Sequence, residues 1–219
     1  MIPRIGVTVS LAALVASVAG RSAAQADTSR ATLWDHTLHI SALVGESFAT
    51  GQWRNSFSAG DYGAISMAWP VSHGSSIWVE GQFNGQSQLM TNVVQSAFQA
   101  TGGGASIYSL TLNLVLSPRD LLFGRVTPYV LGGGGGYSRQ VELDDFAGTA
   151  ACSPYLGFCG VYGQPAVRTR TQNVLGWDAG GGFRMRLESL WVVVEARRNV
   201  ASTRYGGTSF VPISVGVAW

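Results

Sequence analysis

Residues 208–219 read TSFVPISVGVAW and alternate along their length between two kinds of side chain. One parity is entirely apolar and ends in an aromatic ring; it consists of Val211, Ile213, Val215, Val217 and Trp219. The other parity carries small, uncharged residues, namely Pro212, Ser214, Gly216 and Ala218. Because the side chains of a β-strand point alternately to its two faces, the segment predicts a strand with a single apolar face.

Such a strand fits two environments. In a soluble β-sandwich the apolar face would cover a core, whereas in a membrane barrel it would meet lipid and Trp219 would join the aromatic belt at the membrane–water interface. The segment resembles the C-terminal sorting strand of bacterial outer-membrane β-barrel proteins. That resemblance implies recognition of this strand by the barrel-insertion machinery.

The N-terminal residues 1–26 have the pattern of an export signal. Arg4 supplies the positive start, residues 5–19 are apolar with small polar interruptions, and Ala24-Gln25-Ala26 fits a small-x-small cleavage site. The segment is too rich in Ala, Ser and Gly for a spanning helix, which needs about 20 strongly apolar residues. We therefore expect a cleaved signal peptide over 1–26 and one exported domain over 27–219.

Composition narrows the class of protein further. The 14 basic residues are all Arg, and two of them, Arg4 and Arg21, lie in the predicted signal, which leaves twelve Arg against 12 acidic residues. A neutral balance argues against a nucleic-acid partner, since such proteins show a basic excess. Charged residues make up only 12% of the chain, against about 25% in a typical soluble domain.

Alternating segments recur along the chain and predict eight strands. They lie near residues 36–46, 60–70, 75–86, 105–117, 125–138, 171–187, 190–199 and 208–219. An even number of segments of about ten residues is typical of transmembrane barrels. The connections alternate between short and long, with the long ones at 47–59, 87–104, 139–170 and 199–209. This alternation predicts short periplasmic turns and four long extracellular loops.

The alternation alone does not tell which face is outside, because a lipocalin-like soluble barrel would turn its apolar face inward. The less apolar parity, however, carries charges of both signs that could pair inside a narrow lumen: Glu80, Asp178, Arg184, Arg186, Glu195 and Arg197. Aromatic residues near strand ends suit the interfacial belts: Trp69, Tyr129, Trp177 and Trp219. We therefore predict an all-β, eight-stranded antiparallel up-and-down transmembrane β-barrel with its apolar face toward lipid.

The region 27–219 as a whole resembles the small eight-stranded outer-membrane barrel family, of the OmpA transmembrane domain and OmpX type. The resemblance is carried by Pro128–Leu131 with the glycines that follow, by LGWDAGGG at 175–182, and by the strand at 208–219. It implies a Gram-negative-type outer-membrane location, with outer-membrane lipid and lipopolysaccharide as partners. These patterns specify architecture rather than activity.

Two features of the connections carry further expectations. Cys152 and Cys159 lie in the longest loop of an exported chain, where a disulfide is the natural interpretation, and without a histidine in that loop zinc is disfavoured. The loop tip between them is apolar and could contact an unknown surface ligand. The glycine tract 132–136 lacks the Lys-Ser/Thr of a phosphate loop, so we attribute it to the bending of strands in a small barrel.

The sequence predicts no catalytic, cofactor-binding or metal site. Lipid A chemistry on a barrel relies on histidine, but His36, His39 and His73 fall at the predicted periplasmic end, opposite the outer leaflet. We expect a non-enzymatic outer-membrane protein with a structural or surface-interaction role through its extracellular loops. The alternatives are a narrow, porin-like channel through the charged lumen and, less favoured, a lipid A-modifying barrel enzyme.

Overall fold

The computed structural model describes residues 38–71, 76–92, 95, 102–117, 126–144, 152–153, 158–159, 168–187, 190–201 and 207–219. Eight long strands dominate it: β1 His39–Thr50, β2 Gly60–Pro70, β3 Ile77–Leu89, β4 Gly102–Leu116, β5 Val126–Asp144, β8 Arg168–Leu187, β9 Leu190–Ala201 and β10 Thr208–Ala218. The shorter elements are a 3₁₀ turn, η1 Gly51–Asn55, and the two-residue strands β6 Cys152–Ser153 and β7 Phe158–Cys159.

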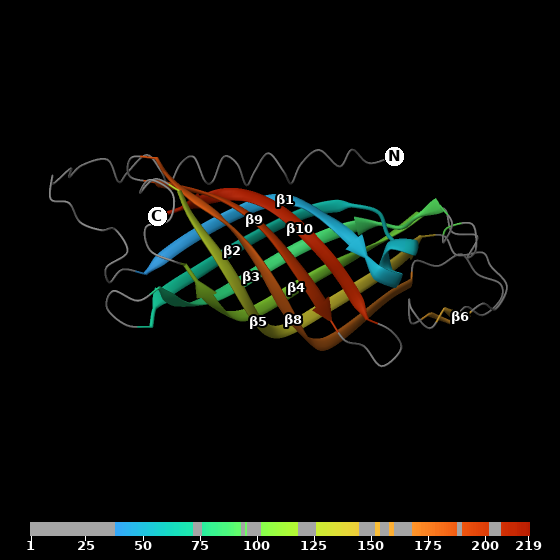
Figure 1. The fold of residues 1–219 in the computed structure, drawn as a ribbon. Coiled ribbons are helices and arrows are strands. Elements are labelled where there is room, and N and C mark those ends of the chain that lie inside the picture. The colour runs from blue at the N-terminus through green and yellow to red at the C-terminus, as the bar shows by residue number, and fades with distance from the viewer. Residues whose placement is uncertain are drawn as a thin grey trace, which may run out of the picture. The chain divides into compact units, whose positions relative to one another are not determined.

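The eight long strands close into one antiparallel barrel in the order β1-β10-β9-β8-β5-β4-β3-β2 (Figure 1). Each strand pairs with its neighbours along the chain, and β1 closes the wall by pairing with β10. The last rung of this seam is reciprocal, since the Ile40 and Trp219 backbones exchange N–H···O bonds of 3.1 and 3.0 Å. The predicted eight-stranded up-and-down barrel is confirmed.

We call the end of the barrel that holds His39 and Trp219 the base, and the opposite end, which holds Thr50 and Thr208, the mouth. At the mouth the strands run farther than the sequence predicts. β5 continues to Asp144 and β8 begins at Arg168, while the predicted long loop at 199–209 shrinks to residues 202–207. Ladder hydrogen bonds continue where most side chains are polar, so apolar alternation marks only part of β5 and β8.

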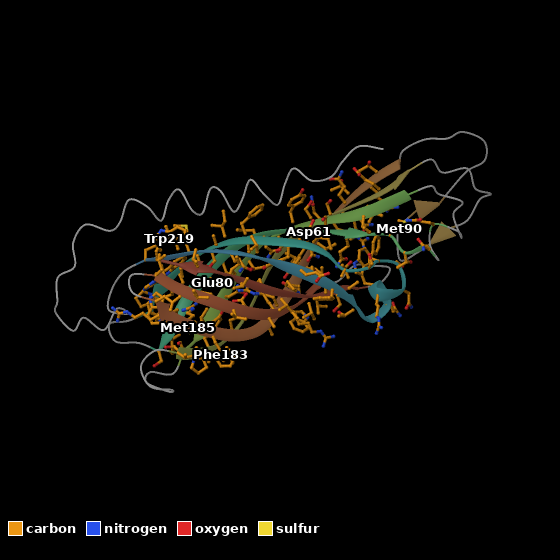
Figure 2. The ribbon with its side chains drawn as sticks, turned by 90° about the horizontal axis from the view of Figure 1, so that it is seen from above. Asp61, Glu80, Met90, Phe183, Met185 and Trp219 are labelled. Carbon is orange, nitrogen blue, oxygen red and sulfur yellow. The ribbon has the colours of Figure 1, made fainter. Side chains whose placement is uncertain are left out.

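The wall has two chemically distinct faces. Along β4, Leu110, Leu112, Leu114 and Leu116 are exposed on the outside, and the alternate residues are buried inside. The same holds in β10, where Ile213 and Val215 are exposed and Ser214 is buried. In Figure 2 the Phe183 and Met185 side chains project from the outer wall while Glu80 lies within. No helix in the described part of the chain is long and apolar enough to cross a membrane.

Tyr129 departs from the predicted interfacial belt. Trp69, Trp177 and Trp219 are exposed as expected, but Tyr129 is buried on the inward face of β5. The glycines that follow it carry no side chain on either face, so the sequence offers no parity signal for this strand. The predicted signal peptide, together with His36 and His73, lies outside the described residues.

Candidate functional site

Arg197 of β9 lies at the centre of a buried charge cluster in the lumen, with 1% of its side chain exposed. Its Nη1 atom lies 2.8 Å from Asp178 Oδ2, and its Nη2 atom lies 2.9 Å from both Glu80 Oε1 and Glu195 Oε1. Its Nε–H also donates to Glu195 Oε1 at 3.0 Å. A planar guanidinium with five N–H donors suits three carboxylates that arrive from three different strands.

Neutral hydrogen-bond donors complete the coordination of the carboxylates. The Tyr129 hydroxyl donates to Glu195 Oε2 at 2.7 Å. The Asn113 amide donates to Glu80 Oε1 at 3.3 Å, and the Ser66 hydroxyl donates to Glu80 Oε2 at 3.2 Å. Buried charges are tolerated only when such pairing offsets their desolvation, so this set of contacts lets the barrel keep ionised groups in its interior.

The two remaining predicted charges, Arg184 and Arg186, differ in their burial. Arg184 is buried toward the base, with its guanidinium carbon 4.4 Å from the centroid of the Tyr129 ring. Arg186 is exposed, so its predicted place in a buried network is corrected. Arg186 pairs with Trp191 one rung before β8 ends. Trp191 is buried at this rung, so the indole rather than the guanidinium occupies the enclosed space.

Glycines of the 175–182 stretch make room for the cluster. A Cβ atom on Gly182 would lie 2.8 Å from the Tyr129 hydroxyl oxygen, and one on Gly180 would lie 2.8 Å from Arg197 Cα. A Cβ on Gly176 would lie 2.6 Å from the Tyr137 ring. Each inward glycine of β8 therefore faces one large lumen side chain, which gives the glycine-rich motif a packing role.

A second layer of packing lies at the mouth, where the turn η1 folds inward. Trp53 of η1 stacks on Phe57 with ring centroids 4.2 Å apart, and its indole N–H donates to Gln88 Oε1 at 2.7 Å. The Arg139 guanidinium lies 5.1 Å from the centroid of the Trp53 ring. We call the buried apolar set here the mouth cluster: Ala49, Trp53, Phe57, Met90, Ala105, Ile107, Tyr137, Val141, Ala201 and Phe210.

The sequence does not predict the mouth cluster, because residues 47–59 lack strand alternation and indicate an extracellular loop. The signal that could have found it is the pair Trp53 and Phe57, which stand out in the polar stretch 51–58. Together, the charge cluster and the mouth cluster fill the lumen at two levels. Within the described residues, no group of three or more His, Cys, Asp or Glu side chains is placed to hold a metal ion.

Cys152 and Cys159 occupy opposing positions in the small β6–β7 sheet, where they are register partners. Direct cross-strand partners are the closest positions on neighbouring strands, which agrees with the proposed pairing. The disulfide itself stays a prediction.

No protein-family model and no curated protein sequence matches the chain. Among solved structures, Neisserial surface protein A is similar with a TM-score of 0.53 and 12% identity, over 83% of this chain and 95% of that one. A major outer membrane protein from Thermus thermophilus is similar with a TM-score of 0.50 and 14% identity, over 84% of this chain and 99% of that one.

This chain has the fold of the small eight-stranded outer-membrane barrels. The fold expected from the sequence resemblance is therefore confirmed, and at these identities the likeness concerns the fold alone.

Proposed function

We propose that this chain is a non-enzymatic barrel of the bacterial outer membrane that presents its mouth connections at the cell surface for structural or adhesive contacts. The observation that carries the proposal is the inverted distribution of polarity in the wall. Large apolar side chains such as Leu175, 80% exposed, face outward, while Arg197 and three acids are buried inside. Lipid is the environment in which such a wall is stable.

The filled lumen favours an anchoring role over transport. Paired charges occupy its middle and the mouth cluster occupies its upper part, so the barrel serves as a rigid support. Connections at 51–59, 90–101 and 145–167 leave the wall at the mouth, and the last of them includes β6 and β7. Loops on a rigid scaffold are where binding residues concentrate. An unknown surface ligand would therefore bind at the mouth.

Insertion into the membrane follows from the same proposal. The outward parity of β10, ending in Trp219, is the surface that the barrel-insertion machinery would recognise after export through a signal peptide at 1–26. Outer-membrane lipid and lipopolysaccharide would then surround the apolar wall.

The first test is electrophoresis of residues 27–219 refolded in detergent, with and without boiling. We expect a compact, strand-rich species whose band shifts on boiling. A chain that folds in buffer without detergent would overturn the membrane assignment, because the apolar parity would then have to face inward.

The second test places an epitope tag in the mouth connection 145–167 and, in a separate variant, in the base connection 117–125. On intact cells an antibody should reach the first tag, and it should reach the second only after permeabilisation. The reverse result would overturn the proposed orientation.

A narrow channel is the second candidate, and one observation favours it. Several buried lumen groups on β2, β3 and β4 have no hydrogen-bond partner among the described residues: Tyr62 Oη, Gln82 Nε2, Asn84 Oδ1, Gln86 Nε2 and Ser109 Oγ. Buried polar groups of this kind bind ordered water. If the charge cluster plugs a hydrated path, Glu195→Ala should raise ion conductance in planar bilayers. Unchanged conductance counts against this candidate.

A further inference from the structure

Arg139 of β5 is a buried cation at the mouth that contacts only uncharged groups. The residue is 5% exposed. Its Nη1 atom donates to Thr208 Oγ1 at 2.9 Å, its Nη2 atom donates to Gln172 Oε1, and its guanidinium lies over the Trp53 ring. In the described part of the chain no carboxylate pairs with Arg139. Neutral acceptors and an aromatic face offset only part of the cost of burying a charge, so this cation lacks a counter-ion.

A second cation lies beside Arg139 where an acid would be expected. Arg139 pairs with Gln172 in the β5–β8 ladder, and Arg170 lies two residues before Gln172 in β8. Arg139 and Arg170 are therefore diagonal neighbours on the inward face, about 7–8 Å apart and within reach of long side chains. The nearest acid along β5, Glu142, has the opposite parity and is exposed. The two like charges repel each other, and an anion between them would remove that repulsion.

The guanidinium of Arg139 has one N–H group available for such an anion. Its Nε atom is buried and has no hydrogen-bond partner among the described residues. Nε and Nη2 lie on the same edge of a guanidinium, and this edge can bind a carboxylate or phosphate group with two parallel hydrogen bonds. Because Nη2 contacts Gln172, the edge faces β8. The unpartnered N–H therefore lies on the side of the strand that carries Arg170.

The wall of the barrel is incomplete on this side of the mouth. The β8–β9 ladder ends where Gly176 pairs with Ala201, so among the described strands residues 168–175 of β8 pair with β5 alone. Arg170 is exposed and Gln172 is half-buried, although both have the parity that is buried lower in the wall. A small anion can therefore approach the two arginines past β8.

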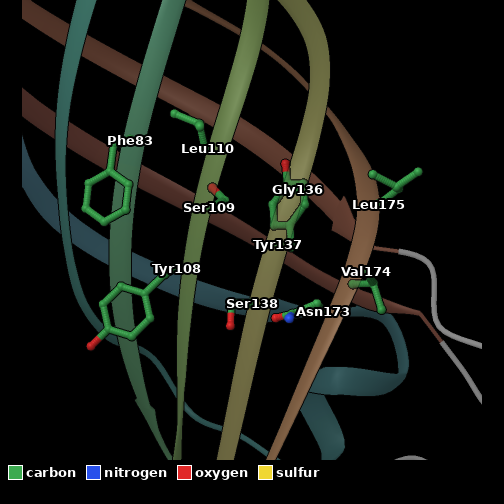
Figure 3. A pocket seen from close by; sticks show the side chains of 10 residues that line it. All are labelled: Phe83, Tyr108, Ser109, Leu110, Gly136, Tyr137, Ser138, Asn173, Val174 and Leu175. Carbon is green, nitrogen blue, oxygen red and sulfur yellow. The ribbon is translucent and has the colours of Figure 1, made fainter.

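The outer wall next to the two arginines is polar. Figure 3 shows Leu110 and Leu175 beside an outer-wall cavity of about 470 Å³, with Ser138 and Asn173 farther toward the mouth. Ser138 pairs with Asn173 and directly precedes Arg139. On this side of the barrel the arginines thus lie beyond the apolar part of the wall, at a height where an anion dissolved in water can reach them.

We propose that Arg139 and Arg170 form a binding site for a phosphate group, either free or as a monoester. Such a group carries a charge of about −1.5 to −2 at neutral pH, which matches two guanidinium cations, and its oxygens suit the guanidinium fork. The exposed Arg170 would contact the phosphate first, and Gln172 would turn aside to admit it to the Nε–H of Arg139. A carboxylate carries a single charge and would leave one cation uncompensated.

This inference deepens the proposed function, because it gives the chemistry of a ligand at the mouth, and it rests on that function for exposure of the site at the cell surface. The experiment is isothermal titration calorimetry of the detergent-refolded barrel with inorganic phosphate, glucose 1-phosphate or acetate at constant ionic strength. The variants are Arg139→Gln and Arg170→Gln. The matched control is Arg54→Gln, which removes an exposed cation of η1 at the same end of the barrel.

We expect Arg170→Gln to weaken phosphate binding about tenfold, because a charged hydrogen-bond donor is lost, and Arg139→Gln to weaken it at least as much. Arg54→Gln should keep the wild-type affinity. Arg170 is exposed, so its variant keeps the test decisive even if Arg139→Gln does not refold. Equal weakening by Arg54→Gln would overturn the site, since binding would then reflect general charge attraction. Acetate that binds as tightly as phosphate would overturn the choice of ligand.

The two phosphate ligands distinguish the source of the group. Tighter binding of glucose 1-phosphate would assign the site to a phosphorylated saccharide, and equal affinity would assign it to free phosphate. Heat-shift electrophoresis separates this inference from the proposed function. If the wild-type chain shows no shift, the proposed function fails. If it shifts but binds neither phosphate ligand, the phosphate site alone fails.

Discussion

At the scale of single residues, the lumen depends on the shape of one guanidinium. Arg197 contacts Glu80 and Asp178 with its terminal nitrogens and contacts Glu195 with both Nη2 and Nε. A lysine ammonium is a point charge on a flexible stem and would not reach all three carboxylates with this geometry. The cluster thus ties β3, β8 and β9 together through one side chain.

Arg197→Met should therefore destabilise the barrel strongly. Removing the cation leaves three buried acids without their partner, and loss of one partner of a buried pair typically costs about 3–5 kcal/mol. The measurement is urea unfolding in lipid vesicles, followed by tryptophan fluorescence. Arg54→Met, at an exposed position of η1, is the control. Equal unfolding midpoints in the two variants would contradict the central role of Arg197.

The inward glycines allow a sharper test at the same scale. Gly182→Ala would force a Cβ against the Val194 carbonyl oxygen and against the Tyr129 hydroxyl, which donates to Glu195. Overpacking of this kind typically costs about 1–3 kcal/mol. Gly136→Ala, which adds its Cβ to open space, should be close to neutral. The same urea titration compares them, and a neutral Gly182→Ala would remove the packing role assigned to this glycine.

Parity along each strand predicted the inward positions of Glu80, Asp178, Glu195 and Arg197, but not which arginine is central. That choice depends on how far each position lies along the barrel axis. The axial position of a residue is set by the register between its strand and the neighbouring strands. Arg197 and Arg186 occupy different rungs of the β8–β9 ladder, and only Arg197 is buried. A single sequence carries little information on such register.

At the scale of elements, strands were predictable and the turn η1 was not. Alternation over residues 60–70 matches β2 at both ends, because most of that strand alternates between lipid and lumen. η1 gives no periodic signal, since one turn of helix buries a single residue, Trp53. Its inward fold depends on tertiary partners, such as Gln88, that local sequence does not reveal.

Trp53→Ala should detach η1 from the mouth cluster. Truncation of a buried large aromatic residue typically costs about 3–5 kcal/mol, and here it also removes the partner of the Gln88 amide oxygen. We expect a lower unfolding midpoint and faster proteolysis of the β1–β2 connection. Arg54→Ala, at the exposed next residue, should change neither quantity. Identical proteolysis rates for the two variants would contradict the anchoring of η1.

At the scale of the whole molecule, the wall inverts the polarity of a soluble protein. The number, order and pairing of the strands could be predicted because alternation and turn signals repeat along the entire chain. The extension of β5 to Asp144 and of β8 to Arg168 could not, since most residues of these two extensions are polar. The same limit applies to β5. Its glycines have no side chains, so the sequence does not show which face of this strand Tyr129 occupies.

A charge on the outer wall tests this inversion directly. Leu112→Arg should lower the free energy of unfolding in lipid vesicles by about 2–4 kcal/mol, because the arginine would face hydrocarbon. Ser87→Arg, exposed near the mouth, should cost far less. In a soluble protein, either substitution at an exposed position would change the free energy of unfolding by no more than about 0.5 kcal/mol. Equal costs for the two variants, measured by urea unfolding in vesicles, would contradict a lipid-facing wall.

The seam between β1 and β10 has a consequence for the timing of biogenesis. The rung that joins Ile40 to Trp219 unites segments from the two ends of the described chain, so no partial product of synthesis can close the cylinder. Until β10 pairs with β1, the incomplete sheet has two edge strands with unpaired backbone N–H and C=O groups. Such edges promote aggregation. Closure of the barrel is therefore the last strand pairing to form in this topology, because it needs both β1 and β10.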